Sequence, residues 1–548
     1  MKNSIKFLFA ASLVALATSC TDLDVTPESQ YTQYPSNDIA VEAKMADVYF
    51  QLRGDFGRRF FEVQALSSDE FTAVSYGGGW YDSGAYAHPS LHNYSTEDAT
   101  IDWMPNVISG CTKANRVILD LGGENAEPKM IAPARAMRAF FHFILMDCWG
   151  DAPILDHVLA DGEKIDRSPR AEVAKFIESE LKEIIPLLTD EVSENTYGKP
   201  TKWMAEALLA KLYINWAVYT ASSVDQYDAA TAKNEKLNDC IAVCDDIIQS
   251  KKFNLGSMAY RFKFAPTNGY KVEDFIYAMP YDTHTQQGMQ WGRALTWKDS
   301  KSCAKSYYGM KLSNSGGGYI TMTPEAAARF NLEGDERNLC ILGLGDGTVH
   351  VYDPSTYLPT DEVALDKKGN PIKLSPSITI QEKNSEGQDI REMLDVGDDI
   401  HGYSQGCRPL KFFVIDDDFM NGRNQSNDVP IFRYADILMM KAEAITRGGN
   451  ATLGDTPQSL FNQIRSYVHA PLLDHNPSLQ ELLDERGREF FNEQWRRNDM
   501  IRFGTFEGEF FPHYTGFPTA SFDKRHRIFP LHRDVINTNP NWNQNPGY

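Results

Sequence analysis

The sequence predicts an all-α fold, a scaffold of helical hairpins interrupted by long irregular loops and short β-hairpins. Two observations predict this architecture. Apolar residues recur at helical spacing in three regions, about residues 37–54, 101–254 and 431–505. The intervening segments 55–100 and 255–430 mix Gly, Asn and Asp with short β-like runs. No low-complexity segment or charge block marks a linker, so we expect one domain over residues 37–548.

The first 19 residues have the three parts of a secretory signal peptide. Lys2 and Lys6 give it a positive start, residues 7–16 are apolar, and the small residues 17–19 lead to Cys20. The apolar run is shorter than the roughly 20 residues that a helix needs to cross a bilayer. We therefore expect residues 1–19 to be a cleaved signal peptide rather than a membrane span.

Cys20 stands at the predicted cleavage position. A cysteine there resembles a bacterial lipobox, in which the thiol is acylated and the cysteine becomes the first residue. The alternative is an ordinary secretory signal followed by an incidental cysteine. We expect lipidation of Cys20, with residues 20–36 as a polar tether. No later segment has 18 uninterrupted apolar residues, so this lipid is the only predicted membrane attachment.

The first long helical region repeats one pattern. Apolar residues spaced by three and four positions occur in the segments 137–148, 173–184, 209–216 and 237–248. Turns that contain Gly, Pro or Asn separate these segments. Successive helices joined by loops are typical of stacked helical hairpins.

The insertions and the C-terminal part follow. Within 255–430, the runs 275–278 and 412–415 are β-like, and the glycine-rich segment 343–347 is typical of a hairpin turn. Beyond them, residues 433–447 form a helical pattern that stops at a Gly-Gly pair. Two more helices are expected over residues 457–467 and 479–502.

The composition and the absence of known motifs exclude several classes of function. A formal net charge of −21 repels phosphate backbones, so we expect no nucleic-acid partner. The sequence contains no zinc-protease helix, nucleophile elbow or phosphate-binding loop, and its eight cysteines lack metal-ligand spacing. The acidic run 416–418 lacks the alternating oxygens of a calcium loop, so calcium stays possible without being indicated. We therefore expect no cofactor, no metal site and no catalytic residue.

Large aromatic residues in the insertions are the main candidate for a binding site. Trp80 follows a triple-glycine segment, and Trp291 and Trp297 lie six positions apart. Exposed flat rings stack on the apolar C–H faces of sugars, and nearby polar groups bind hydroxyls. The alternative is that these rings fill a local core under the loops. The predicted glycan contacts are Trp80, Tyr81, Trp291, Trp297, Tyr76, Asp69, Asp82, Arg293 and Tyr307.

Six segments in order resemble the SusD/RagB family of Bacteroidetes outer-membrane lipoproteins. They are residues 103–118, 134–153, 431–443, 462–465, 485–502 and 529–548. Residues 431–443, for example, read IFRYADILMMKAE, which is similar to a family signature. Val107 departs from the pattern, because an aromatic residue is common there. The matched motifs belong mainly to the scaffold, and we expect five of their residues to pack helices or form ion pairs: Arg433, Asp436, Glu485, Arg486 and Arg496.

The resemblance implies a fold, a partner and a location. It implies an all-α fold of tetratricopeptide-like helix pairs, with a ligand site made by irregular insertions. It also implies non-catalytic glycan capture at the cell surface and a SusC-like TonB-dependent transporter as partner in the outer membrane. The acidic surface favours a neutral polysaccharide or oligosaccharide.

Three alternatives stay open at this point. One is a surface lipoprotein of the same fold that captures peptides, which would favour main-chain pairing over stacked rings. Another is a glycoside hydrolase, which needs two convergent carboxylates about 5–10 Å apart. Asp69 and Glu70 are adjacent acids, but adjacent side chains rarely converge on one bond. The third is a structural lid whose ligand contacts lie mostly on the transporter.

Overall fold

The structure is a computed structural model, and it describes residues 38–256, 258–314, 316–415, 418, 423–507, 514–515 and 523–548. The chain forms two compact units, Met1–Lys44 and Met45–Tyr548. Of the first unit, the structure describes only the beginning of helix α2 (Asp38–Tyr49). The predicted signal peptide, Cys20 and the whole tether 20–36 lie outside the described residues.

The first long helical region of the second unit is confirmed as a set of packed helices. It contains α6 (Met104–Asp120), α7 (Pro128–Trp149), α8 (Arg170–Ile184), α9 (Lys202–Ile214), α10 (Trp216–Tyr219) and α11 (Leu237–Ser250). Helix α7 packs between α6 and α8, and α9 packs on both α8 and α11. Neighbours in sequence are thus neighbours in space, as expected for helical hairpins.

Local sequence signals set the ends of these helices. Helix α7 begins at Pro128, whose fixed φ suits the first helical turn, and ends at Gly150, whose φ of +78° suits glycine. The Thr201 side chain caps α9 by accepting a hydrogen bond from the backbone N–H of Met204 at 3.2 Å. Helix α7 is buried along most of its C-terminal half, so it lies at the centre of the scaffold.

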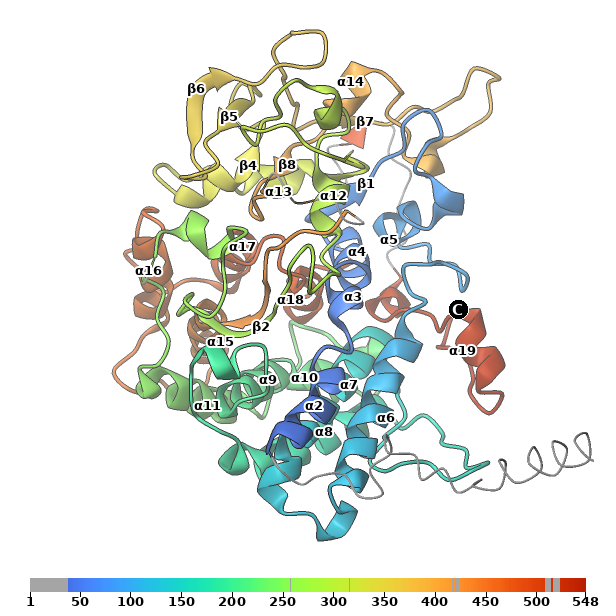
Figure 1. Cartoon of the computed structure of the whole chain (residues 1–548), viewed down its shortest axis with the longest axis vertical. Helices are drawn as coiled ribbons and strands as arrows, with labels where there is room; N and C mark the ends of the chain where they lie inside the picture. The colour runs from blue at the N-terminus through green and yellow to red at the C-terminus, as the bar shows by residue number, and fades with distance from the viewer. Residues whose placement is uncertain are drawn as a thin grey trace, which may run out of the picture. The chain divides into compact units, whose positions relative to one another are not determined.

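The C-terminal helices complete the scaffold. They are α15 (Tyr434–Thr446), α16 (Pro457–Tyr467), α17 (Leu479–Glu489), α18 (Arg496–Phe503) and α19 (Arg533–Thr538). Helix α15 packs on α11, α16 and α17, which joins the two helical regions. Figure 1 shows α9 and α11, in green, beside α15.

One predicted helix, residues 479–502, is wrong as a single element. The structure divides it into α17 and α18 around a turn in which Asn492 and Gln494 adopt positive φ. The apolar spacing continues across this turn, so periodicity alone does not reveal it. Glu493 in the turn instead forms ion pairs with Lys411 and Arg433.

The insertions contain short strands and helices. The strands are β1 (Phe71–Ala73), β2 (Phe275–Met279), β3 (Ile320–Met322), β4 (Ile341–Leu342), β5 (His350–Tyr352), β6 (Pro359–Val363), β7 (Ile378–Thr379), β8 (Arg408–Pro409), β9 (Val429–Arg433) and β10 (Tyr514–Thr515). Within the described ranges they form five two-stranded sheets: β1 with β3, β2 with β9, β4 with β8, β5 with β6 and β7 with β10. Figure 1 shows β4, β5, β6 and β8 gathered away from α9 and α11.

Strand β2 confirms the β-like run 275–278. The prediction of a strand over 412–415 is wrong, because these residues do not pair as a strand, although the first three of them are buried. The glycine-rich turn at 343–347 joins β4 to β5, but these strands pair with β8 and β6, so it is not a hairpin turn. Short apolar runs and turns fix neither the pairing partner nor the register.

The segment 55–100 is less irregular than expected. It contains the end of α3 (Arg53–Phe56), the buried helix α4 (Arg59–Leu66) and the short helix α5 (Ala87–Leu91). Three further short helices, α12 (Trp291–Leu295), α13 (Pro324–Ala328) and α14 (Ile400–Tyr403), lie in the second insertion. Hydrophobic periodicity does not predict helix α4, because nearly every side chain in it is buried and the helix has no exposed polar face.

Buried ion pairs connect the strands and helices of the scaffold. Arg433, at the end of β9, pairs with Glu493 at 2.7 Å, Glu489 at 2.8 Å and Asp274 at 2.6 Å. The other four motif residues expected in the scaffold also form buried ion pairs, so that prediction is confirmed: Asp436, Glu485, Arg486 and Arg496. We call Arg433 and its three carboxylate partners the Arg433 cluster.

Two further properties bear on the environment of the chain. Within the ranges that the structure describes, no helix combines the length and the apolar character needed to cross a bilayer. The seven described cysteines are buried and free.

Candidate functional site

Most of the predicted aromatic contacts are buried, which corrects the expectation that they form an exposed surface. Trp291, Trp297, Tyr76 and Tyr307 are each at most 2% accessible. Trp291 stacks on Phe61 with ring centroids 5.2 Å apart, and its Nε1 donates a hydrogen bond to Asn492 Oδ1 at 2.6 Å. This ring is part of the core between α12 and α4.

The other three rings belong to the core of the second insertion or border it. Trp297 and Tyr307 lie in an apolar cluster with Phe413, and the Tyr307 hydroxyl accepts a hydrogen bond from the Trp297 backbone N–H at 3.1 Å. The Tyr76 hydroxyl donates to the Gly318 carbonyl at 2.5 Å. The alternative that these rings fill a local core under the loops therefore holds for all four.

Asp69 is also a structural residue. Its carboxylate pairs with Arg496 at 2.7 Å and with Arg329 in a largely buried position. Burial raises the pKa of Asp69, but Arg329 and Arg496 outweigh that effect and lower it to about 2. With both charged partners supplied by the fold, Asp69 is not available to a ligand, which corrects its assignment as a glycan contact.

The neighbouring carboxyl group behaves in the opposite way. Glu70 is buried, and this burial raises its pKa to about 8. The folded chain thus holds a proton that an unfolded glutamate releases near its ordinary pKa of 4.5. Stability must therefore fall as the pH rises between these two values.

We expect the Glu70→Gln variant to gain stability relative to the parent chain across this window, by about 1.4 kcal/mol per pH unit. Glutamine keeps the size of the side chain and removes the titration. Urea unfolding of both chains from pH 4 to pH 9 measures the difference. The exposed residue Glu191 supplies a control, since Glu191→Gln should follow the parent at every pH; a constant offset for Glu70→Gln would contradict the prediction.

The exposed part of the predicted site is the Trp80 loop, residues 77–82. Gly77 and Gly78 have φ of +58° and +81°, and the backbone groups of Tyr76 and Gly79 bond reciprocally at 3.0 Å, as in a type I′ turn. The carboxylate of Asp395 accepts hydrogen bonds from the N–H groups of Gly77 and Gly78 at 3.2 and 2.6 Å. The loop is therefore held in place by the second insertion.

This turn presents the remaining predicted contacts. Trp80 and Tyr81 are partly exposed, and Asp82 is exposed. The Trp80 ring stacks on Tyr319 with centroids 4.5 Å apart and planes 14° apart. The guanidinium carbon of Arg293 lies 5.3 Å from the Trp80 ring centroid. The structure thus brings Trp80 and Arg293 together from two insertions.

Tyr319 was missed by the sequence reasoning. It lies directly after the glycines 316–318 and is 2% accessible, so it supports Trp80 rather than meeting solvent. A cation or a sugar face can pack against an indole ring that is fixed in this way. The only available signal was a second aromatic residue after a glycine run, which resembles the pattern at Trp80.

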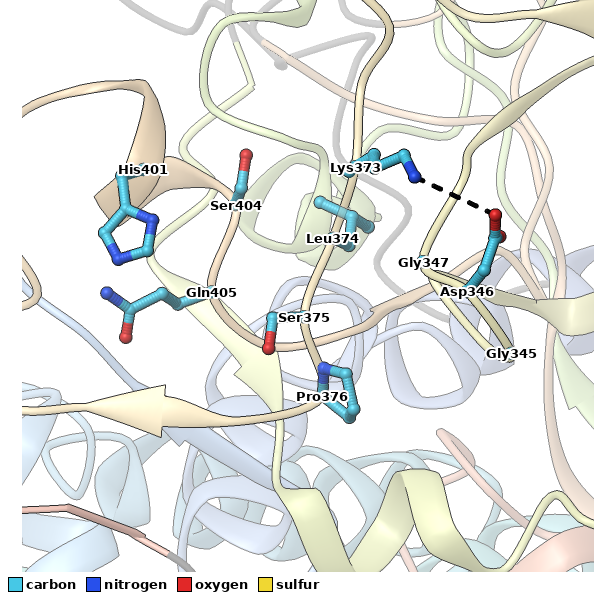
Figure 2. A pocket seen from close by; sticks show the side chains of 10 residues that line it. All are labelled: Gly345, Asp346, Gly347, Lys373, Leu374, Ser375, Pro376, His401, Ser404 and Gln405. Carbon is cyan, nitrogen blue, oxygen red and sulfur yellow. Dashed lines mark ion pairs between the residues drawn. The ribbon is translucent and has the colours of Figure 1, made fainter.

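A cavity of about 380 Å³ lies elsewhere in the second insertion. Figure 2 shows His401, Ser404 and Gln405 lining it, together with Lys373 and Asp346, which form an ion pair at 3.9 Å. Its lining contains hydroxyl, amide, imidazole and charged groups but no tryptophan, tyrosine or phenylalanine. It lacks the stacking surface that the Trp80 loop offers.

Comparison with known proteins identifies the family. The family model described as "SusD family" matches residues 274–548, which is half of the chain. The chain belongs to the SusD family. A second model, "Starch-binding associating with outer membrane", matches residues 23–214. The glycan-binding proteins of the SusD family are non-catalytic, so the expectation that this chain is not an enzyme is confirmed.

Individual SusD relatives align over almost the whole chain. The starch-binding protein SusD of Bacteroides thetaiotaomicron is 23% identical and covers 99% of both chains. Surface glycan-binding protein A of the same species, solved in complex with laminarihexaose, has a TM-score of 0.68 at 17% identity, covering 93% of this chain and 99% of its own. A laminarin-binding SusD-like protein has a TM-score of 0.66 at 19% identity, covering 93% and 100%. The mostly helical SusD-like fold is thus confirmed.

Proposed function

We propose that this chain captures an oligosaccharide or polysaccharide at the cell surface and delivers it to a SusC-like TonB-dependent transporter in the outer membrane. The observation that carries the proposal is membership of the SusD family. SusD relatives are named for starch, laminarin and surface-glycan binding, and one is solved with laminarihexaose. Trp80, Tyr81, Asp82 and Arg293 are the proposed glycan contacts.

The geometry of the Trp80 loop supports this role. A partly exposed indole ring that is stacked on a buried tyrosine keeps a fixed orientation, so little rotamer entropy is lost when a sugar packs against it. Arg293 supplies hydrogen-bond donors at 5.3 Å from the centre of that ring. One apolar surface with a few convergent polar groups is typical of a small-molecule site.

Affinity gel electrophoresis of residues 21–548 in gels that contain single polysaccharides tests the proposal. Retardation by at least one glycan is expected, and calorimetry with oligosaccharides then gives the affinity. A calorimetric control with protein digests addresses the peptide alternative. Heat from peptides without retardation by any glycan would contradict the proposed function.

The Trp80→Ala variant should bind glycan more weakly by about 1 kcal/mol or more, roughly a fivefold increase in Kd. The variant loses the stacking surface and keeps the scaffold. Tyr270→Ala, which removes a ring that is 41% accessible outside the Trp80 loop, is the matched control and should bind normally. Identical calorimetric titrations for Trp80→Ala and the parent chain would exclude Trp80 as a contact.

We also propose that residues 1–19 are removed and that a lipid on Cys20 holds residues 37–548 at the membrane through the tether 20–36. The short apolar run, the small residues before Cys20 and the polar residues after it support this assignment. Mass spectrometry of the chain extracted from membranes tests it, since an acylated Cys20 is expected at the N-terminus. A mature chain that begins at another residue would contradict it.

A further inference from the structure

A row of arginine and aromatic side chains surrounds Trp80. Arg58 donates a hydrogen bond from Nη2 to the Tyr86 hydroxyl at 3.0 Å, and the Tyr86 ring lies 4.8 Å from Tyr319. Tyr319 stacks on Trp80, and Arg293 lies against the Trp80 ring. These contacts connect Arg58, from the start of α4, to Arg293, from α12. Arg293 thus lies against a partly exposed indole, and Arg58 lies at the other end of the row.

Carboxylates of the described residues balance only part of the positive charge in this row. Glu62 pairs with Arg58 at 3.0 Å and with Arg59 at 2.9 Å, and Asp102 pairs with Arg59 at 3.9 Å. Among the described residues, no carboxylate pairs with Arg293 or with the exposed Arg423. The chain has 75 acidic side chains and a net charge of −21, so this local excess of arginine runs against its composition.

Arg293 is the member of the row whose guanidinium is least satisfied. Its Nε is buried and lacks a hydrogen-bond partner within the described structure. Burial lowers the pKa of its guanidinium, and the charges of Arg423 and Arg58 lower it further. A half-buried cation beside two other cations is unfavourable by itself, and an anion at this position would relieve the repulsion. Contact with the Trp80 ring offsets only part of this cost, because a cation–π contact supplies no counter-charge.

We propose that the Trp80 loop selects an acidic glycan, whose uronate carboxylate or sulfate group is held by Arg293 while a sugar ring packs on Trp80. A guanidinium presents paired N–H donors that fit the two oxygens of a carboxylate or sulfate. This inference rests on the proposed glycan-binding function. It replaces the expectation of a neutral glycan, which came from the overall charge and not from the side chains at the site.

The test compares glycans that differ only in charge. Hexagalacturonate and its fully methyl-esterified form have the same backbone, and calorimetry with residues 21–548 measures both. We expect the acid to bind about tenfold more tightly than the ester, and this preference to shrink as NaCl is added. A chondroitin sulfate hexasaccharide and its unsulfated counterpart carry the same uronates, so comparing them separates sulfate recognition from uronate recognition. Laminarihexaose and maltohexaose serve as neutral probes.

Variants assign the preference to particular residues. Arg293→Gln should remove most of the difference between acid and ester, while Trp80→Ala should weaken both. Arg116→Gln, on the exposed surface of α6, removes the same charge elsewhere and should leave the preference unchanged.

The possible results are distinguishable. Equal binding of acid and ester, or binding of the neutral probes alone, would overturn the acidic-glycan inference and leave the proposed function intact. An acid preference that survives Arg293→Gln would overturn the assignment to Arg293. Failure of every glycan to bind would contradict the proposed function itself.

Discussion

Replacing Arg433 with methionine is expected to destabilise the chain by about 3–5 kcal/mol, because the change takes one charged partner from each of three buried carboxylates. Arg433 is 2% accessible and pairs with three carboxylates, those of Asp274, Glu489 and Glu493. In the variant Lys263 still pairs with Asp274 and Lys411 with Glu493, but each of the three carboxylates loses one charged partner. Methionine fills most of the volume and supplies no charge.

Urea unfolding of the parent and variant chains measures this loss. Arg391→Met is the matched control, because Arg391 pairs with Asp389 at 2.5 Å on the surface, where the two side chains are 46% and 55% accessible. Exposed pairs of this kind contribute little to stability, so the control should unfold at the same urea concentration as the parent. If Arg433→Met also unfolded at the same urea concentration as the parent, the Arg433 cluster would not stabilise the packing of β9 on the helices.

The Trp291→Ala variant should lose about 3–5 kcal/mol of stability, as is typical of an aromatic side chain deleted from a core. Trp291 is fully buried, stacks on Phe61 and meets Phe71 edge-on with centroids 6.0 Å apart. Its loss leaves a cavity and also removes the hydrogen bond to Asn492. Unfolding curves and the melting temperature report the effect.

Trp80→Ala is the natural comparison for this variant, since both remove a tryptophan. Trp80→Ala should affect glycan binding and leave the unfolding midpoint close to that of the parent. Trp291→Ala should do the reverse, with normal affinity in the folded fraction. A stable Trp291→Ala chain with lost binding would show that Trp291, rather than Trp80, meets the ligand.

Periodicity predicted the scaffold well where helices have one buried face. Helix α16 has the predicted bounds, Pro457–Tyr467, because Thr456 caps it and Pro457 starts it. Periodicity failed at the turn between α17 and α18, where Glu493 leaves the helix to reach Arg433. The partner that decides this break lies 60 positions away in the sequence. A local pattern carries no information about such a partner.

The same limit explains why buried rings were predicted as exposed glycan contacts. Glycine and polar neighbours around Trp291 and Trp297 gave no sign of partner surface, yet Phe61 and Phe413 come from distant segments to cover rings in these positions. Trp80 has similar neighbours and is partly exposed. The residue types of the site were therefore predictable, whereas their burial depends on which distant segment packs against each ring. The pairing of Trp80 with Arg293 across two insertions is of the same kind.

The anchoring of the Trp80 loop by Asp395 also sets when recognition becomes available during synthesis of the protein. The hydrogen bond from Gly77 to Asp395 joins residues 318 positions apart. At roughly 5–20 residues per second, the ribosome completes that stretch about 16 to 64 s after the glycine turn is made. A chain that is cut before residue 395 would contain every atom of Trp80 and lack the carboxylate that holds its turn. A truncated chain of this kind should therefore bind the proposed glycan more weakly than the full chain.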